Sequence, residues 1–217
     1  MNIYIGGGSY CYERNSNSWL HFFSNKLNAK TEGKGYPGRG FWNSRLHLID
    51  YLKTGTNTDL FVFCHTEPSR IISSTYSKIK HTFDADSKIP PNNKEIVEMY
   101  YKYLYEEDIH NWAMKSWFLE LNQILSGKPV IHLFSSAPTF RLSEQLMGYK
   151  LKTDLFTHTL NSNTEAGPRL LENAKIINHF TIDYNIKFGN ALADYCIDEV
   201  LVNPTQTKYF DFAFYNK

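Results

Sequence analysis

The sequence lacks several features that would point at once to a cellular role. No apolar run approaches the roughly 18 residues that cross a bilayer, so no membrane span is expected. The 23 basic and 22 acidic side chains give a net charge of +1. Without a basic excess we expect no nucleic-acid partner. Residues 1–8 have neither a basic region nor a long apolar stretch, so we predict no signal peptide and expect a cytoplasmic protein.

Cysteines and metal-ligand patterns are also sparse. The three cysteines, Cys11, Cys64 and Cys196, are widely spaced and one has to stay unpaired, which favours reduced thiols. No His, Asp or Glu cluster has metal-ligand spacing, so we expect no metal and no other cofactor. The chain has no Walker A loop, and it has no G-x-G-x-x-G fingerprint because Cys11 stands where the last glycine would fall.

Strand and helix patterns alternate along the chain. Apolar runs predict buried strands at Asn2–Ile5, Leu60–Cys64 and Val130–Phe134, with weaker strand signals near Ala29–Thr31 and, as an edge element, at Leu151–Phe156. Helical spacing predicts helices over Trp19–Leu27 (capped by Ser16 or Asn17), Trp42–Leu52, Lys94–Ser126 with a break near His110, and Tyr184–Val200. This order predicts an α/β fold, a three-layer α/β/α sandwich with a mostly parallel central sheet of the flavodoxin-like kind.

We expect residues 1–217 to form one domain. The polar, irregular stretch 71–93 is interpreted as an insertion or lid. The aromatic tail 203–217 is expected to pack on the domain, on a second copy of the chain or on an assembly partner. Trp112, Trp117 and Phe118 are expected in the core, because they recur along a predicted helix, and a surface for a partner is the alternative.

A strand that runs into glycines and a serine, Ile5-Gly6-Gly7-Gly8-Ser9, is the strongest local motif. Glycines allow a sharp turn, and open α/β sheets bind ligands outside the carboxyl ends of their strands. Ser9 is therefore a candidate nucleophile, although a serine that satisfies local backbone groups fits the same residues. Its candidate base is His179, just before the last predicted helix, since neutral imidazole accepts protons near pH 7; a helix-entry residue is the alternative.

The order of these motifs resembles the SGNH (GDSL-like) hydrolase superfamily. The first block is the turn at Ser9, with Gly8 where the family has Asp. Gly38 or Gly40 matches the glycine whose N–H joins the oxyanion hole. After the next strand the family has Asn, and the segment here offers Thr66 instead. His179 matches the last block, D-x-x-H, while position 176 is Ile.

The resemblance implies serine-dependent hydrolysis of a small-molecule or glycan ester, such as an O-acetyl or acyl ester. Ser9 would attack and His179 would move the proton. Because the usual Asn and Asp are missing, a catalytically inactive binding or assembly module, of viral or phage origin, is the alternative, and acyl or sugar transfer is a third. Glu67 and Arg70 form either an ion pair that closes a turn or a site for a substrate anion.

Overall fold

The computed structural model describes residues 1–12, 16–36, 40–70, 91–155, 157 and 180–211. Six strands form one sheet in the order β2-β1-β3-β4-β5-β6, and every neighbouring pair is parallel. The strands are β1 (Asn2–Gly7), β2 (Lys30–Gly35), β3 (Leu60–His65), β4 (Val130–Phe134), β5 (Tyr149–Leu151) and β6 (Lys208–Phe210). The predicted α/β fold is confirmed, and the described sheet is parallel throughout.

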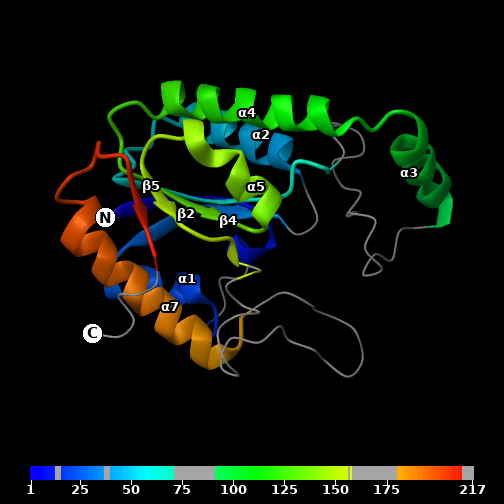
Figure 1. Cartoon of the computed structure of the whole chain (residues 1–217). Helices are drawn as coiled ribbons and strands as arrows, with labels where there is room; N and C mark the ends of the chain where they lie inside the picture. The colour runs from blue at the N-terminus through cyan, green and yellow to red at the C-terminus, as the bar shows by residue number, and fades with distance from the viewer. Residues whose placement is uncertain (13–15, 37–39, 71–90, 156, 158–179, 212–217) are drawn as a thin grey trace.

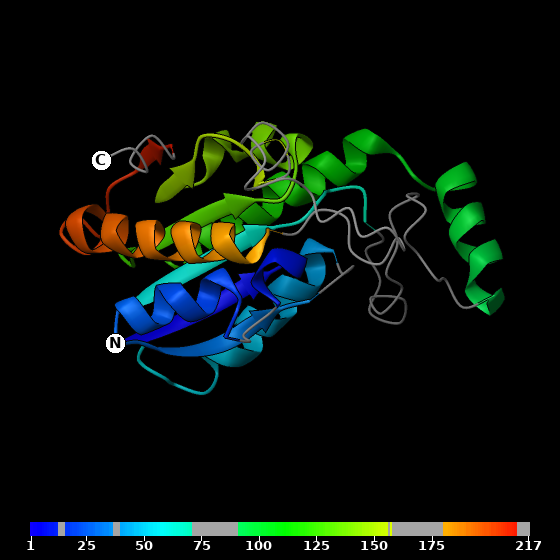
Figure 2. The same cartoon turned by 90° about the horizontal axis from the view of Figure 1, so that it is seen from below.

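Helices cover both faces of the sheet. One face carries α1 (Trp19–Lys26) and α7 (Ile182–Tyr195), and the other carries α2 (Phe41–Leu52) and α4 (Glu107–Ile124) (Figure 1). The shorter elements are η1 (Ser9–Cys11), α5 (Ala137–Arg141), η2 (Ser143–Gln145) and η3 (Cys196–Val200). In the view from below, α3 (Pro91–Tyr103) stands to one side of the sandwich (Figure 2). This is the three-layer arrangement expected from the sequence.

Alternating strand residues divide the core into two layers. Toward α1 and α7 the sheet presents Ile3, Ile5, Leu60, Val62, Ile131 and Leu133. Toward α2 and α4 it presents Tyr4, Phe61, Phe63, Val130 and Phe134. Both sets are nearly inaccessible to solvent. Burial on both faces explains why the strands read as continuous apolar runs.

Several boundaries differ from the sequence-based expectation. Ser18 caps α1 by accepting the His21 N–H, in place of Ser16 or Asn17. The weak strand signal near residue 30 belongs to the full strand β2. The edge element predicted at Leu151–Phe156 is instead β5, which ends at Leu151 and lies inside the sheet. The edge on that side is β6, formed by part of the aromatic tail. Of the predicted lid, 71–90 lies outside the described residues, and 91–93 begins α3.

The long predicted helical region is two helices, and they separate between residues 103 and 107 rather than near His110, which lies within α4. Trp117 and Phe118 are buried as expected, but Trp112 is 70% exposed, so its assignment to the core was wrong. At 3.6 residues per turn, Trp112 lies about 140° around the helix from Trp117, outside the buried stripe.

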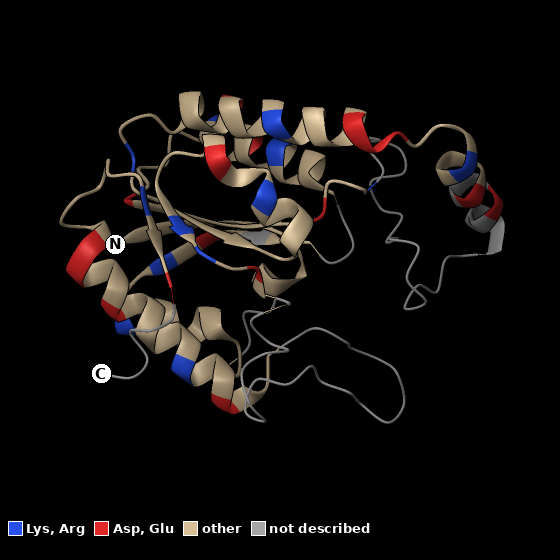
Figure 3. Ribbon diagram, in the orientation of Figure 1, with Lys and Arg blue, Asp and Glu red and all other residues tan. Residues whose placement is uncertain are grey.

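Charged residues of both signs are interspersed over the helices and strands (Figure 3). None of the helices in the described ranges combines the length and the apolar character needed to cross a bilayer.

Gly189 lets α7 pack directly against α1. A Cβ atom built on Gly189 would lie 2.4 Å from the Trp19 carbonyl oxygen and 2.9 Å from the Phe22 Cβ. Ala normally stabilises a helix interior by about 1 kcal/mol relative to Gly. For Gly189→Ala we nevertheless expect the free energy of unfolding to fall by about 1–3 kcal/mol, because overpacking outweighs propensity.

Chemical denaturation measures this change. The neighbouring variant Asn190→Ala is the control and is expected to keep wild-type stability. A Gly189→Ala protein as stable as wild type, or more so, would contradict the close packing.

Candidate functional site

The connections of the sheet reverse direction at β1. From β1 the chain passes to β2 on one side, and it then returns to β3 on the other side. Parallel α/β sheets bind ligands at such a switch point, outside the carboxyl ends of the two strands. The Gly7-Gly8-Ser9 turn leaves β1 at this point, and Thr66 and Glu67 follow β3 there. The fold therefore brings the first and third blocks of the resemblance to one edge of the sheet.

Two glycines permit this juxtaposition. Gly7 has φ of +125°, and a Cβ there would lie 2.0 Å from the Cys64 carbonyl oxygen. A Cβ at Gly35 would lie 2.0 Å from the Gly8 carbonyl oxygen. Backbone hydrogen bonds close the turn on both sides: the Gly8 N–H donates to Cys64 at 2.8 Å, and the Tyr36 N–H donates to Gly7 at 2.9 Å. Only backbones without side chains fit this closely.

Ser9 begins the short helix η1 and is partly exposed. Its carbonyl accepts the Tyr12 N–H at 3.0 Å. Between the residues that the structure describes, no hydrogen bond uses the Ser9 hydroxyl. Ser9 therefore lies where open α/β sheets bind their ligands.

Of the other predicted site residues, Gly40 caps the amino end of α2, whereas Gly38 and His179 lie outside the described residues. Phe180, the residue after His179, is buried in the core. Its ring centroid lies 5.4 Å from the ring centroid of Tyr10, the residue after Ser9. The indole N–H of Trp19 donates to the Tyr10 carbonyl at 2.8 Å. The chain segments that follow the two candidate catalytic residues are therefore in contact.

Glu67 is the centre of a polar network beyond β3. Its Oε2 accepts the Nε and Nη2 of Arg70, each at 2.6 Å, and the Thr66 hydroxyl at 2.9 Å. Its Oε1 accepts the Ser135 hydroxyl at 3.3 Å. The Arg70 and Glu67 side chains are only 14% and 25% exposed. A hydroxyl has one proton, so in this arrangement Thr66 directs its proton to Glu67 rather than to a substrate.

The protonation state of Glu67 follows from these partners. Burial raises the pKa of its carboxyl group, but the Arg70 charge and the hydrogen bonds from the Glu67 N–H, Thr66 and Arg70 outweigh burial. The net result is a pKa below the usual value, so Glu67 is ionised at neutral pH. A carboxylate held in this way is a poor general base near pH 7.

Three helices and the residue after β4 hold the backbone at the end of β3 and in this loop. The His65 carbonyl accepts the N–H of Ser135, the residue after β4, at 2.8 Å. The Thr66 carbonyl accepts the hydroxyl of Thr139 in α5 at 3.1 Å. The Pro68 carbonyl accepts the Nδ1–H of His110 in α4, and the Ser69 carbonyl accepts the hydroxyl of Tyr101 in α3, both at 2.8 Å. Packed elements thus fix the loop at the carboxyl end of β3.

Sequence reasoning missed these supports. Ser135 follows a predicted strand, so the strand-end rule that selected Thr66 could have found it. Tyr101 and His110 carry no local signal, because their role arises from how α3 and α4 pack.

A buried histidine pair lies beneath α4. His65 Nε2 and His132 Nδ1 are 2.9 Å apart, and His132 Nε2 lies 2.9 Å from the Met147 carbonyl. Because a carbonyl only accepts, His132 carries its proton on Nε2, and His65 donates from Nε2. Burial lowers the pKa of His65 well below its usual value and that of His132 to about 3. His65 is therefore a buried, hydrogen-bonded core histidine.

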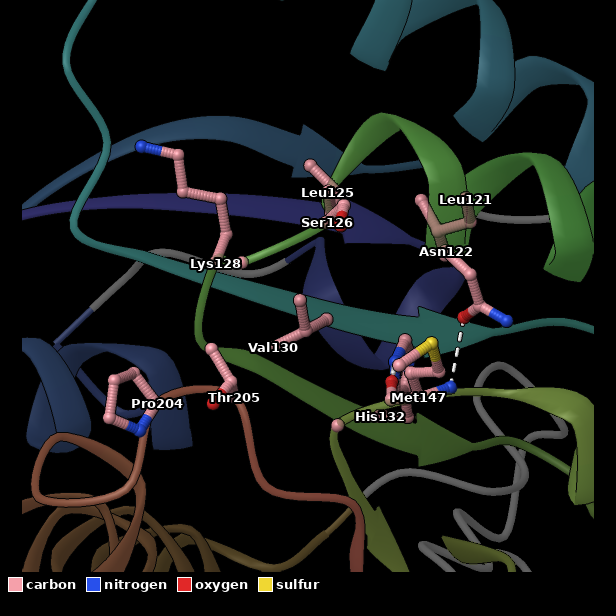
Figure 4. Close-up of a pocket in the computed structure, with 12 residues that line it drawn as sticks. Leu121, Asn122, Leu125, Ser126, Lys128, Val130, His132, Met147, Pro204 and Thr205 are labelled. Carbon is pink, nitrogen blue, oxygen red and sulfur yellow. Dashed lines mark hydrogen bonds between the residues drawn. The ribbon is translucent and has the colours of Figure 1, made fainter.

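His132 also lines a cavity of about 60 Å³ (Figure 4). Lys128, Val130 and Gly148 line it too, so it lies at the amino ends of β4 and β5, away from Ser9. Over the described ranges, no group of three or more His, Cys, Asp or Glu side chains is arranged to hold a metal ion.

Comparison of the chain with protein-family models, with curated proteins and with solved structures gives no match. The resemblance to SGNH hydrolases therefore depends on the motifs, and the structure independently supports only the α/β architecture.

Replacing Glu67 tests the network. For Glu67→Gln we expect the free energy of unfolding at pH 7 to fall by about 1–3 kcal/mol, because Arg70 loses its charged partner. The folded-state pKa of Glu67 is depressed, so its contribution is present above the usual value of 4.5 and is lost as the pH falls through the lower folded value. The difference in the free energy of unfolding between wild type and Glu67→Gln should therefore become smaller below pH 4.5.

Urea unfolding at several pH values measures this gap. Asp50→Asn is the control, because Asp50 and Lys53 form an exposed pair at the same i,i+3 spacing; it should not change stability measurably. A gap that stays constant down to pH 3 would rule out the ionised Glu67 network.

The histidine pair predicts a separate loss of stability in weak acid. The unfolded chain takes up these protons near pH 6.5, whereas folded His132 takes one up only near pH 3. The unfolded state then binds more protons, so stability falls as the pH drops below 6.5, by up to about 1.4 kcal/mol per pH unit for each histidine.

Unfolding curves between pH 7.5 and 5 test this slope. A His65→Gln/His132→Gln double variant should have a flatter dependence, whatever its absolute stability. His21→Gln, on the outer surface of α1, should keep the wild-type slope. Equal slopes for wild type and the double variant would contradict the buried neutral pair.

Proposed function

We propose that the protein is a serine-dependent ester hydrolase of the SGNH type, with Ser9 as nucleophile and His179 as general base. The single observation that carries this proposal is the contact between the rings of Tyr10 and Phe180, the residues that follow Ser9 and His179. Tyr10 and Phe180 are far apart in the sequence, but both pack into the core layer between the sheet and the helices α1 and α7. The switch-point position of Ser9 gives the proposal further support.

The chemistry has two steps. The Ser9 hydroxyl attacks the ester carbonyl carbon while His179 takes its proton, and the alcohol then leaves with that proton. Water next attacks the carbonyl carbon of the acyl-serine while His179 accepts the water proton; the bond to the Ser9 oxygen then breaks, His179 returns the proton to that oxygen, and the acid is released. The backbone N–H groups of Ser9 and of Gly38 or Gly40 would stabilise the oxyanion.

Two features predict a slow enzyme. Thr66 replaces the family's Asn, but its proton is engaged by Glu67. The loss of one oxyanion donor typically costs about 100–1000-fold in rate. Ile176 stands where the triad acid would be, so a backbone carbonyl or no group at all would orient His179.

The same features favour a second candidate function, a binding or assembly module without catalysis. In the described loop, the Glu67 carboxylate is already satisfied by Arg70, Thr66 and Ser135. This candidate retains the fold and the ordered loop but requires no reactive Ser9.

A fluorophosphonate probe distinguishes the two candidates. For the hydrolase we expect one covalent label, on Ser9, and hydrolysis of p-nitrophenyl acetate at a measurable rate. Ser9→Ala should abolish both, while Ser16→Ala, a change at an exposed nearby serine, should change neither. His179→Ala should slow labelling by about 100-fold or more, since that is the usual contribution of a general base.

His21→Ala is the matched histidine control and should label at the wild-type rate. If folded wild-type protein shows no label on Ser9 anywhere between pH 5 and 9, the hydrolase proposal fails and the binding module stands.

A further inference from the structure

An apolar stripe on α4 is exposed to solvent, along the outside of the sandwich (Figure 1). Ile109, Trp112 and Leu119 form this stripe, and their side chains are 54%, 70% and 49% exposed. At about 100° per residue, the three positions lie within about 80° of one another around the helix. The buried residues of α4, among them Trp117, face the sheet from the opposite side of the helix.

The size of this surface fits one half of a standard protein interface. Leu104, three residues before α4 begins, is 71% exposed and adds apolar surface at that end of the stripe. The four side chains together expose about 400–500 Å², since a large apolar side chain presents about 150–250 Å². A standard interface covers about 800 Å² of each partner, roughly 60% of it apolar. The stripe can therefore supply the apolar part of such an interface.

The charges beside the stripe are self-complementary. Asp108 and Lys115 are exposed, and at 3.6 residues per turn both lie along the same edge of the stripe. Within the described residues neither side chain forms an ion pair. If two α4 helices pack antiparallel with Asp108 opposite Lys115 of the second copy, two-fold symmetry forms this ion pair twice. The same register sets Leu104 opposite Leu119 of the second copy.

We propose that the outer face of α4 is a homodimer interface, at which a second copy of this chain packs its own α4 antiparallel across a two-fold axis beside Trp112. The apolar stripe, its area and the self-complementary charges carry this inference. It depends on neither Ser9 nor His179, so it goes beyond the proposed hydrolase activity.

The charge pattern favours a second copy over other occupants of this face. Helices that lie on membranes are rich in Lys and Arg along their polar face, whereas one edge of this stripe has one acid and one base. Antiparallel helices that cross at about 20° interdigitate their side chains along such a stripe. A tryptophan at the centre of an interface usually contributes much of the binding energy. Trp112, close to the axis, would have this role in both copies.

Sedimentation equilibrium of the full-length protein at micromolar concentrations tests the dimer. We expect a reversible equilibrium between monomer and dimer. Trp112→Ala should raise the dissociation constant at least about 30-fold, because the central side chain is lost from both copies. Val202→Ala is the control and should leave the dissociation constant unchanged, since Val202 is equally exposed but lies beyond η3.

Reversal of the two charges tests the register. Asp108→Lys alone sets two lysines against each other at both pairs and should raise the dissociation constant at least about 10-fold at low salt. Lys115→Asp alone should do the same with two acids. The double variant Asp108→Lys/Lys115→Asp restores both ion pairs and should dimerise nearly as tightly as wild type. Such recovery would show that the single variants lost the contact and not the fold.

Three results would overturn the inference: a chain that stays monomeric across the micromolar range, a dimer that Trp112→Ala does not weaken, or a double variant that dimerises no more tightly than the single ones. A monomer that floats with vesicles of phosphatidylcholine and phosphatidylserine would assign the stripe to a membrane surface instead. Ser9→Ala should dimerise as wild type does, whatever its labelling shows, so the two proposals fail separately.

Discussion

At the carboxyl end of β1, three parallel strands approach so closely that backbone atoms occupy the space where side chains would lie. Gly7 faces the Cys64 carbonyl across the pair with β3, and on the β2 side Gly35 faces the carbonyl of Gly8. Any larger residue at either glycine would push a neighbouring strand away. The position of Ser9 and the placement of the loop after β3 both depend on this constraint.

The loop after β3 shows a different principle, in which polar groups are held by many elements at once. Three of its backbone carbonyls accept hydrogen bonds from α5, α4 and α3, and the His65 carbonyl at the end of β3 accepts one from Ser135, which follows β4. Glu67 also joins the loop to Arg70 and Ser135. Binding and catalytic loops work best when a rigid scaffold positions them. The saturation of Glu67 also limits its chemistry, because a carboxylate with this many donors neither takes up a proton easily nor releases Thr66.

The histidine pair is distinct from the candidate site although His65 ends the same strand. Strand alternation turns His65 toward the α2 and α4 layer, whereas Cys64 faces the α1 and α7 layer. Burial among Phe63, Phe118 and Phe134 keeps both rings neutral. The side chains of His65 and Cys64, which are neighbours in β3, therefore lie on opposite faces of the sheet.

The sequence alone determined the order of strands and helices, because apolar runs and helical spacing are local patterns. The strand-end rule also grouped Ser9, Thr66, Glu67 and Arg70 at one edge. Three-dimensional packing decided what no local pattern contains. In the folded chain β6, part of the tail, is one edge strand of the sheet, and Trp112 is exposed to solvent. Tyr101 and His110 are hydrogen-bonded to the loop after β3. Such contacts join residues far apart in the sequence, and only the packing of whole elements fixes them.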